Sequence, residues 1–368
     1  MKILVTGAKG FIGSSLVRLL KRKDYEVLPF DTSNTEEELV SYLKEADFIV
    51  HLAGINRPLN VEEFYDGNLN FTAKLLSLIE KYNQKVPILF SSSTQANKDN
   101  DYGHSKKMAE NLFYPLSKDR KIYVFRFYNV YGKGCRPNYN SVIATWCYNI
   151  ARDIPISFNE DAPMIDFVYI DDVLDNIIDA IEGKKDVTMD ESSILYPEPH
   201  DHLSLKDIRD YLYSFKDFSN TLELPKQEGF VKKLYATYLS YLPEDKLITN
   251  LNSHIDNRGS FTEALHIPSY GQVSINVSHP GITKGNHYHE TKNEKYLCIS
   301  GSVLIKLRKV GQKEVIEIKA DSSHLQLIDI PPGYVHSILT TSKEDSVTLM
   351  WANETFDPQN PDTYAEIV

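Results

Sequence analysis

The segment Tyr102-Gly-His-Ser-Lys106 contains a tyrosine and a lysine whose types and spacing suit proton transfer. On a helix, residues four apart lie on one face, so the phenol and the ammonium would be neighbours. Because an ammonium beside a phenol favours the phenolate, we expect Lys106 to lower the pKa of Tyr102. Such a tyrosine can pass a proton to a substrate oxygen while hydride moves at the attached carbon. Ser93, the last residue of a serine run, can hold the same oxygen.

A second stretch, Tyr114-Pro-Leu-Ser-Lys118, has the same spacing. Pro115 disfavours a continuous helix through this stretch, and no serine run lies just before it. We therefore favour Tyr102 and Lys106 as the chemically active pair. The alternative is that Tyr102 and Lys106 are an exposed pair on a helix without a chemical role.

Three histidines and a glutamate in the last third of the chain could bind a metal. His287 and His289 alternate on a predicted strand and would point to the same side. Glu294 follows them, and His336 comes from a later strand. Three imidazoles and a carboxylate suit Zn²⁺ or another first-row divalent ion. The alternative left open is a metal-free barrel in which these side chains are polar core residues or act directly in catalysis.

A glycine-rich turn near the start of the chain could bind a pyrophosphate. Gly7, Gly10 and Gly13 follow an apolar strand at residues 3–5 and precede a helical pattern. Backbone N–H groups and the helix dipole would point at one spot there. The residues that this turn would bring to a dinucleotide are Gly7, Lys9, Gly10, Phe11, Ile12 and Gly13.

Asp31 bears on which nicotinamide cofactor is used. It ends a predicted strand at residues 25–30, about 20 positions after the glycines, where an acidic residue commonly bonds the adenosine ribose and favours NAD. The alternative is a polar turn over residues 31–34, because aspartate is a favoured turn residue. The sequence leaves this choice open.

The surrounding pattern divides the chain into two domains. Predicted strands at residues 3–5, 25–30, 47–54 and 85–90 alternate with helices, which is typical of a doubly wound parallel sheet. From about residue 251, short alternating runs without helices predict a β-sandwich or barrel. The break at residues 243–246 separates a domain at 1–245 from one at 246–368.

Composition excludes several classes of protein. The 368 residues carry a formal net charge of −11, which argues against nucleic-acid binding. No apolar run approaches the roughly 18 residues of a membrane span. Three cysteines are too few for a disulfide framework, so we expect a reducing, cytoplasmic location.

The first two-thirds of the chain resembles the extended short-chain dehydrogenase/reductases, which act mainly on nucleotide sugars. The resemblance rests on the glycine turn, His51-Leu-Ala-Gly54, the serine run, the tyrosine–lysine pair and Arg126-Phe-Tyr-Asn-Val-Tyr-Gly132. It implies a Rossmann-like α/β fold with Ser93, Tyr102 and Lys106 as the catalytic set. It also implies that Leu52, Ala53, Gly54, Tyr102 and Lys106 contact the cofactor, in addition to the glycine turn and Asp31. Ile165 stands where many relatives carry an arginine that touches the nucleotide phosphates. Our candidates for the substrate side are therefore Asn129 and the 133–140 loop.

The last third resembles the cupin superfamily of jelly-roll barrels, through Gly281, His287-Tyr-His289, Glu294 and Gly301, with a partial second motif ending at His336. This resemblance implies that His287, His289, Glu294 and His336 are metal ligands. The same region is similar to deoxysugar 3,5-epimerases, in which the histidine matching His287 removes a proton without a metal. Lys284, which we add to the catalytic set, stands where those enzymes carry a substrate-binding arginine.

Taken together, the order of the two domains resembles the CapF family of bifunctional capsular polysaccharide enzymes. The resemblance implies C3 epimerisation in the cupin and NADPH-dependent C4 reduction in the reductase domain, with NADH not excluded. The implied substrate is a UDP-linked 4-keto-6-deoxy-N-acetylhexosamine. The implied product is UDP-2-acetamido-2,6-dideoxy-β-L-talose, on the way to UDP-N-acetyl-L-fucosamine.

Two other functions remain open at this stage. One is a single-activity nucleotide-sugar 4-reductase whose cupin serves only to hold a homodimer together. The other is a metal-loaded sugar sensor with a vestigial dehydrogenase domain. The intact set of Ser93, Tyr102 and Lys106 argues against the sensor. A homodimer is expected from a free barrel edge and a tyrosine-rich helix.

Overall fold

The computed structural model describes residues 1–83, 85–118, 120–159, 161–185, 194–268 and 270–368. Contacts within the chain divide it into two compact units. Unit 1 comprises Met1–Leu212 and Lys233–Pro243, and unit 2 comprises Tyr213–Lys232 and Glu244–Val368. The boundary predicted after residue 245 stays a prediction.

Unit 1 is built on a parallel sheet with the strand order β2-β1-β3-β4-β5-β8. Its strands are β1 (Lys2–Thr6), β2 (Glu26–Phe30), β3 (Phe48–His51), β4 (Ile88–Ser93), β5 (Ile122–Phe127) and β8 (Ile194–Leu195). The chain passes from β1 to β2 on one side of β1 and then returns to form β3 on the other side of β1. This reversal opens a crevice at the carboxyl ends of β1 and β3, where sheets of this type bind ligands.

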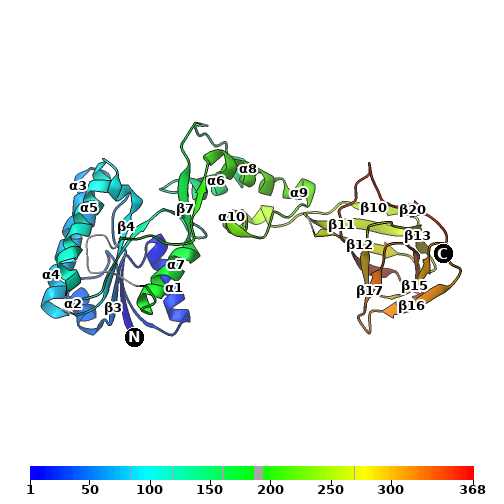
Figure 1. Cartoon of the computed structure of the whole chain (residues 1–368), viewed down its shortest axis with the longest axis horizontal. Coiled ribbons are helices and arrows are strands. Elements are labelled where there is room, and N and C mark those ends of the chain that lie inside the picture. Colours follow the sequence, from blue (N-terminus) through cyan, green and yellow to red (C-terminus); the bar gives the residue numbers. More distant parts are fainter. Residues whose placement is uncertain (84, 119, 160, 186–193, 269) are drawn as a thin grey trace. The chain divides into compact units, whose positions relative to one another are not determined.

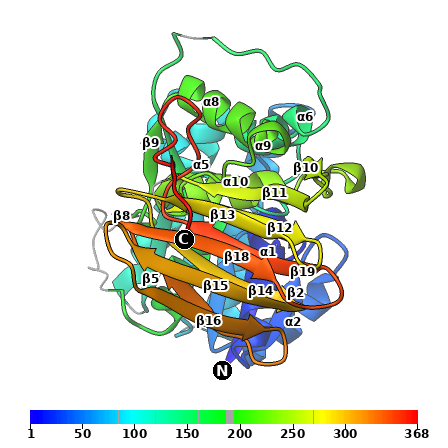
Figure 2. The same cartoon turned by 90° about the vertical axis from the view of Figure 1, so that its right-hand side faces the viewer.

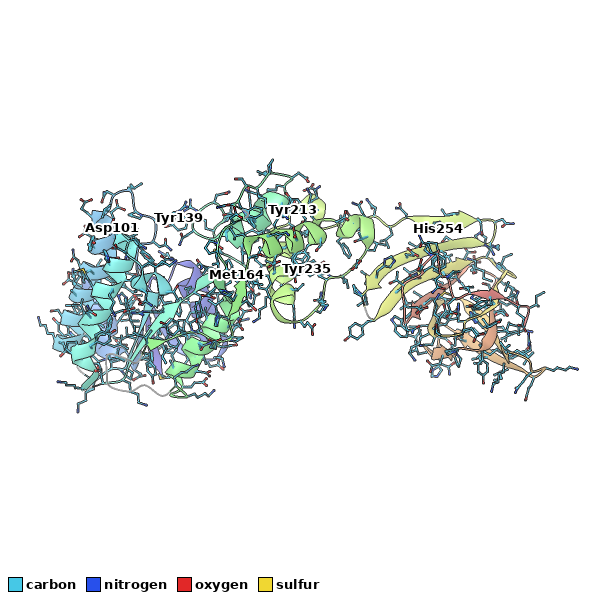
Figure 3. The ribbon with its side chains drawn as sticks, turned by 45° about the horizontal axis from the view of Figure 1, so that its top comes forward. Asp101, Tyr139, Met164, Tyr213, Tyr235 and His254 are labelled. Carbon is cyan, nitrogen blue, oxygen red and sulfur yellow. The ribbon has the colours of Figure 1, made fainter. Side chains whose placement is uncertain are left out.

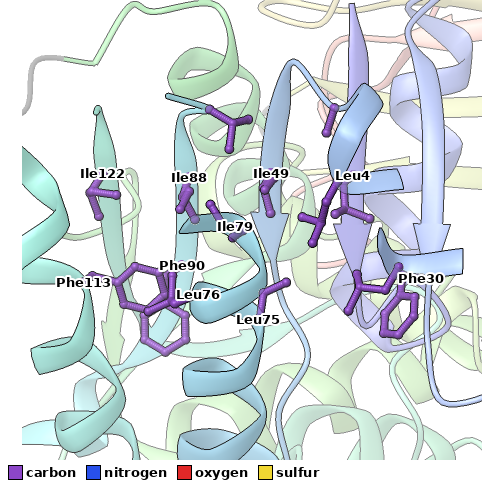
Figure 4. Packing of buried hydrophobic residues seen from close by; sticks show 14 of the residues in the cluster. Leu4, Phe30, Ile49, Leu75, Leu76, Ile79, Ile88, Phe90, Phe113 and Ile122 are labelled. Carbon is purple, nitrogen blue, oxygen red and sulfur yellow. The ribbon is translucent and has the colours of Figure 1, made fainter. Parts of the chain in front are cut away.

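Helices cover both faces of this sheet, with α1 and α7 on one face and α2, α4 and α5 on the other (Figure 1). They are α1 (Phe11–Arg22), α2 (Glu36–Glu45), α4 (Phe71–Tyr82), α5 (Asp101–Phe113) and α7 (Ile170–Ile181). Short helical turns link them: α3 (Glu62–Phe64), η1 (Tyr65–Asn70), η2 (Thr94–Asn97) and η3 (Tyr114–Lys118). Buried apolar side chains of the sheet and of α2, α4 and α5 interlock in the core shown in Figure 4. Burial on both faces explains why these strands are continuous apolar runs.

A small second sheet extends unit 1 beyond the carboxyl end of β5, with the order β6-β7-β9. Its strands are β6 (Asn129–Tyr131), β7 (Ile165–Tyr169) and β9 (Asp201–Leu203). The remaining helices are α6 (Val142–Ile150), α8 (Leu205–Lys216), α9 (Phe218–Thr221), α10 (Gly229–Leu239) and η4 (Glu244–Lys246).

Unit 2 contains two sheets whose paired strands are antiparallel (Figure 2). One has the order β10-β11-β12-β19-β14-β17 and the other β16-β15-β18-β13-β20. The strands are β10 (Ser253–Asp256), β11 (Gly259–Ile267), β12 (Gly271–Ser278), β13 (Thr283–Tyr288), β14 (Glu294–Ser300), β15 (Ser302–Lys309), β16 (Val315–Asp321), β17 (Leu327–Ile330), β18 (Tyr334–Thr340), β19 (Ser346–Ala352) and β20 (Tyr364–Ala365).

Buried and half-buried residues alternate along strand β12, as expected for a strand in a sandwich, but the buried side is polar. Gln272, Ser274, Asn276 and Ser278 are all buried, while the valines and isoleucine between them are half-buried. The Lys284 ammonium on β13 reaches Asn276 Oδ1 at 2.9 Å, so these polar side chains face the opposite sheet. The apolar core of unit 2 lies elsewhere, around Tyr296, Ile305 and Ile338.

The predicted fold class is confirmed: a Rossmann-like parallel α/β unit precedes an antiparallel, cupin-like all-β unit. Among the described residues, no helix is both long and apolar enough to cross a membrane.

Candidate functional sites

The glycine turn between β1 and α1 packs so tightly that no side chain fits at Gly7 or Gly13. Gly7 has φ +68°, and a Cβ there would lie 2.8 Å from Ala53 N. A Cβ on Gly13 would lie 2.1 Å from the carbonyl oxygen of Gly7. Gly10 caps α1 without a side chain, and the first N–H groups of the helix, including those of Phe11 and Ile12, lack an intrahelical acceptor. This turn therefore presents donors to an anion.

The loop after β3 forms the other wall of the same crevice. Leu52 N donates to Thr6 O at 3.2 Å, and Ala53 N donates to Thr6 Oγ1 at 3.3 Å. These bonds hold the 52–54 backbone against Gly7. The structure thus brings the two cofactor segments named from the sequence to the switch point of the sheet.

Asp31 and Lys9 form an ion pair at the end of β2. Lys9 Nζ lies 3.1 Å from Asp31 Oδ1 and donates to Ser33 Oγ at 2.8 Å. Asp31 also accepts from Ser33 N and Ser33 Oγ, each at 2.9 Å. The Ser33 backbone bond is the largest influence that lowers the pKa of Asp31. A carboxylate and an ammonium thus stand together where the adenosine ribose would lie.

The proposed catalytic residues come from neighbouring elements of unit 1. Ser93 ends β4, while Tyr102 and Lys106 lie in the first two turns of α5, which starts at Asp101 (Figure 3). Asn100 caps this helix by accepting from Gly103 N at 2.8 Å. The Tyr102 phenol interacts with the Ser93 hydroxyl, and Lys106 Nζ donates to Ser91 O at 3.0 Å. The other match, Tyr114 to Lys118, is a 3₁₀ turn.

The expectation that Lys106 lowers the pKa of Tyr102 is wrong in this structure. Burial raises the pKa of Tyr102, and the bond to Ser93 offsets only part of that rise. Lys106 points its ammonium at the Ser91 carbonyl, and burial lowers its own pKa to about 8. The phenol is therefore protonated at neutral pH and can act as a proton donor.

Asn68 is a residue of this site that sequence reasoning missed. It lies in the π-helical segment η1 and is 1% exposed. Its Nδ2 donates to Ser105 Oγ at 3.0 Å, and its amide exchanges two 2.9 Å bonds with the backbone of Ile55. A Cβ on Gly54 would meet both Asn68 Oδ1, at 2.7 Å, and Lys106 Nζ, at 3.0 Å. Asn68 therefore ties the crevice loop to α5, through a π-bulge that no sequence pattern signals.

A buried ion pair fixes the distance between Ser93 and α5. Glu110 on α5 is fully buried and receives Arg126 Nε at 2.8 Å, Arg126 Nη2 at 2.7 Å and Ser92 Oγ at 2.5 Å. Burial would raise the pKa of Glu110, but the bonds from Arg126 and Ser92 lower it. Arg126 Nη1 also donates to Asn97 Oδ1 at 2.7 Å. The pair joins the end of β4, β5 and α5 behind the proposed catalytic groups.

The candidate substrate loop, residues 133–140, carries positive charge. Arg57 and Arg136 are exposed and approach the ring of Tyr139, with guanidinium carbons 5.9 and 5.2 Å from its centroid. Tyr139 is labelled in Figure 3. Lys133 instead pairs with Asp171, and Asn129 Nδ2 donates to Asp166 O at 3.0 Å. The two arginines were not singled out from the sequence, because their proximity depends on the loop conformation.

In unit 2 the four predicted metal ligands converge. One ligand atom from each of His287, His289, Glu294 and His336 lies within 4.8 Å of the others. The ring centroids of His287 and His336 are 4.4 Å apart, and those of His287 and His289 are 5.0 Å apart. Glu294 Oε2 lies 3.4 Å from His336 Nε2 and accepts from Tyr296 OH at 2.8 Å.

The chemistry of this cluster fits a divalent metal. Among the described residues, the buried Nε2 atoms of His289 and His336 have no partner with hydrogen-bond geometry. Burial lowers the pKa of His287 to about 4 and also lowers that of His336, which keeps both rings neutral. Burial alone would raise the pKa of Glu294, but His289 and His336 lower it to about 2. Burial alone would lower the pKa of His289, but the Glu294 carboxylate raises it, so a divalent ion would displace the His289 proton on binding. Neutral imidazoles and an ionised carboxylate are the forms that bind Zn²⁺.

Lys284 lies three residues before His287 on β13. Its ammonium donates to Asn276 Oδ1 and Val277 O, each at 2.9 Å, and burial lowers its pKa. It therefore belongs to the polar interior between the two sheets.

Comparisons with known proteins agree with this two-unit organisation. The NAD dependent epimerase/dehydratase family model matches residues 3–191, and the polysaccharide biosynthesis C-terminal domain model matches residues 254–364. A UDP-2-acetamido-2,6-beta-L-arabino-hexul-4-ose reductase from Pseudomonas aeruginosa is 40% identical, over 99% of this chain and 98% of that protein.

Solved structures extend the comparison. Capsular polysaccharide assembling protein CapF from Staphylococcus aureus is 44% identical, with a TM-score of 0.91 and full coverage of both chains. UDP-glucuronic acid 4-epimerase from Bacillus cereus, in complex with NAD, shares only the fold, with 22% identity and a TM-score of 0.56 over 66% of this chain and 98% of that one. The prediction of a nicotinamide-dependent enzyme of the oxidoreductase and epimerase type is confirmed. The chain belongs to the CapF family, in which an NAD-dependent epimerase/dehydratase domain precedes a polysaccharide biosynthesis C-terminal domain.

Proposed function

We propose that this chain converts a UDP-linked 4-keto-6-deoxy-N-acetylhexosamine into UDP-2-acetamido-2,6-dideoxy-β-L-talose in two steps. Unit 2 epimerises C3 and unit 1 reduces the C4 ketone with NADPH, in the supply of UDP-N-acetyl-L-fucosamine for capsular or O-antigen polysaccharide. The observation that carries the proposal is the presence of two chemically complete side-chain sets in one chain. Ser93, Tyr102 and Lys106 suit ketone reduction, and the cluster in unit 2 suits ketone polarisation. We further propose that the enzyme works in the cytoplasm, where reduced nicotinamide cofactor is available.

Epimerisation requires a proton to leave C3 and another to return from the opposite face. The C3–H bond is acidic only if the enolate that forms beside the C4 ketone is stabilised. A divalent ion held by His287, His289, Glu294 and His336 would supply Lewis acidity at the ketone oxygen. Lys284 places an ammonium in the same polar interior, where it can hold the substrate. No electrons are gained or lost in this step.

Reduction then transfers hydride from NADPH to C4 and a proton from the Tyr102 phenol to the ketone oxygen, which leaves NADP⁺ and an alcohol. Burial keeps the phenol protonated until hydride arrives. The Ser93 hydroxyl, which lowers the pKa of the Tyr102 phenol, can hold the ketone oxygen beside it. Reduction traps the epimer, because the alcohol carbon no longer acidifies C3.

One incubation in D₂O tests both steps. The chain, NADPH and the UDP-4-keto sugar are mixed, nicotinamide absorbance is followed, and the product is examined by mass spectrometry and NMR. We expect NADPH oxidation together with one solvent deuterium at C3. Oxidation without that deuterium would leave the cupin as a scaffold, and no oxidation with NADPH or NADH would contradict the reductase.

We propose NADPH as the preferred cofactor because Lys9 stands at the ribose position. Lys9→Gln should raise the KM for NADPH about tenfold and leave the KM for NADH nearly unchanged. A charge-assisted bond to phosphate contributes about 1.5–3 kcal/mol, and the exposure of Lys9 places the effect at the lower end. Lys21→Gln, in the last turn of α1, is the control. Equal changes for both cofactors would contradict the assignment.

We propose that Arg57 and Arg136 bind the diphosphate of the UDP-sugar. They are two exposed cations on one tyrosine ring, and Tyr139 holds them in place. They would replace the arginine that many related reductases carry where Ile165 stands here. Guanidinium groups are well suited to phosphate oxygens.

We propose a homodimer formed by the outer face of the β12-β19-β14-β17 sheet. Ile275, Leu349, Leu297 and Leu327 are register neighbours in one row across that face. They lie opposite the polar interior side chains, and Leu327 is 62% exposed. Leu327→Asp should shift the mass measured by light scattering toward that of the monomer, whereas Leu59→Asp in unit 1 should leave it unchanged. An unshifted mass for Leu327→Asp would contradict this interface.

A further inference from the structure

The last residues of the chain lie along β13, the strand that carries His287, one of the proposed metal ligands of unit 2. Strand β20 pairs antiparallel with β13, so that Ala365 faces His287 and Tyr364 faces Tyr288. The rings of Tyr288 and Tyr364 stack at 5.2 Å, and Glu366 N donates to Asn286 O at 3.0 Å. We call residues 361–368 the C-terminal strap.

Asp362 in this strap binds the turn that follows His289. Its Oδ1 accepts from Glu290 N at 2.9 Å. Its Oδ2 accepts from Thr291 N at 3.0 Å, Thr291 Oγ1 at 3.0 Å and Lys292 N at 2.8 Å. One carboxylate therefore fixes the backbone of the turn that connects His289 to Glu294.

The backbone of Asp362 contacts His289 itself. The carbonyl oxygen of Asp362 lies 2.5 Å from His289 Nδ1. A carbonyl can only accept a hydrogen bond, so Nδ1 must carry the hydrogen. In the neutral ring this leaves the lone pair on Nε2, the buried atom that faces Glu294 and His336. Such a bond fixes both the tautomer and the orientation of a ligating imidazole.

Two further contacts hold the strap in place. Lys292 is 5% exposed, and its Nζ donates to Pro361 O at 3.1 Å. Arg308 Nη2 on β15 donates to Glu366 Oε1 at 2.6 Å and to Ile367 O at 2.8 Å. The strap is therefore anchored on both sides of Asp362.

We propose that the C-terminal strap is part of the metal site, with Asp362 as the positioning residue that presents His289 Nε2 to the ion. The proposal rests on the metal site of the proposed function and assigns to Asp362 a role that no ligand motif contains. A positioning role of Asp362 differs from a purely structural role of the strap in one respect. A structural strap would stabilise metal-free and metal-loaded protein alike, whereas a positioning residue changes the affinity for metal.

The test compares Asp362→Asn with Asp357→Asn in the full chain. An amide at position 362 keeps the shape but replaces one acceptor oxygen with a donor. Asp357 is the matched control, because it accepts from Gln359 N within its own turn. The zinc affinity of each metal-free protein is measured by competition with a chromogenic chelator, and Co²⁺-loaded protein gives a spectrum of the coordination geometry.

We expect Asp362→Asn to weaken zinc binding by about 10- to 100-fold and to shift the Co²⁺ bands, as loss of a ligand-orienting partner does. The rise in unfolding temperature on adding zinc should shrink, while Asp357→Asn behaves as wild type. Thr291→Val removes one of the four bonds to Asp362 and should give a smaller loss, which covers the case in which Asp362→Asn folds poorly.

The possible outcomes distinguish the positioning role of the strap from the existence of the metal site. Unchanged zinc affinity in Asp362→Asn, or an equal loss in Asp357→Asn, would overturn the positioning role and leave the proposed function standing. Failure of the wild-type chain to bind zinc, Mn²⁺ or Fe²⁺ would overturn the metal site and the positioning role together.

Discussion

Replacing Tyr102 with phenylalanine should lower kcat for reduction of the UDP-4-keto sugar by roughly 10²–10⁴-fold, the usual contribution of a positioned general acid. The ring would stay packed near Phe64, with the centroids 5.5 Å apart, so the change removes little besides the proton donor. The KM for NADPH should change little. Nicotinamide absorbance under saturating substrate measures the effect.

The chain supplies a matched control for this substitution. Tyr114→Phe makes the same change in the other tyrosine–lysine stretch, and among the described residues the Tyr114 hydroxyl has no hydrogen-bond partner. It should retain wild-type turnover. In D₂O, Tyr102→Phe should still place deuterium at C3 of recovered substrate, because unit 2 is unchanged. A variant that still reduces at the wild-type rate would rule out Tyr102 as the proton donor.

Glu294→Gln should abolish the C3 exchange and weaken zinc binding by roughly 10²-fold or more. Glu294 supplies the carboxylate of the cluster, and removing one partner of a buried charge pair costs about 2–5 kcal/mol. The measurements are zinc affinity and deuterium at C3 of substrate recovered without NADPH. Chelator treatment of the wild-type chain should have the same effect on exchange, and added zinc should restore it.

The control for Glu294→Gln is Glu317→Gln, which removes an exposed carboxylate on β16 that pairs with Lys306. It should exchange C3 at the wild-type rate. Substrate that has already been epimerised should still be reduced by Glu294→Gln, because unit 1 keeps its own residues. Full exchange in Glu294→Gln, or in metal-free wild type, would favour the metal-independent epimerase chemistry considered from the sequence.

The parallel sheet of unit 1 was predictable because its strands are buried on both faces. Residues 3–5 and 88–90 are continuous apolar runs, and amphipathic helices follow the first run and flank the second. The alternation of such runs with helices predicts a parallel sheet. The position of the glycine turn could also be predicted, because Gly7 and Gly13, which pack against each other, are only six residues apart in the sequence. Local sequence encodes these features.

Features that depend on distant partners could not be predicted. Asp362 is 73 residues from His289, and Glu110 is 16 residues from Arg126. A strand was predicted through His287 and His289, but β13 ends at Tyr288, so His289 lies just beyond it and is positioned by contacts with residues far away in the sequence. The pKa of Tyr102 was predicted in the wrong direction because the sequence reveals neither the burial that raises it nor that the Lys106 ammonium is directed at the Ser91 carbonyl.

The polar inner side of β12 has a consequence for how this family can diversify. Its glutamine, serines and asparagine contact the interior, while the apolar residues of the same strand face outward. These side chains bond one another and Lys284, so exchanging one of them leaves a buried partner unpaired, at a cost of about 1–3 kcal/mol for each lost partner. The inner side of β12 is therefore expected to vary only through compensated changes of bonded partners, whereas its outward-facing positions can vary without breaking these bonds.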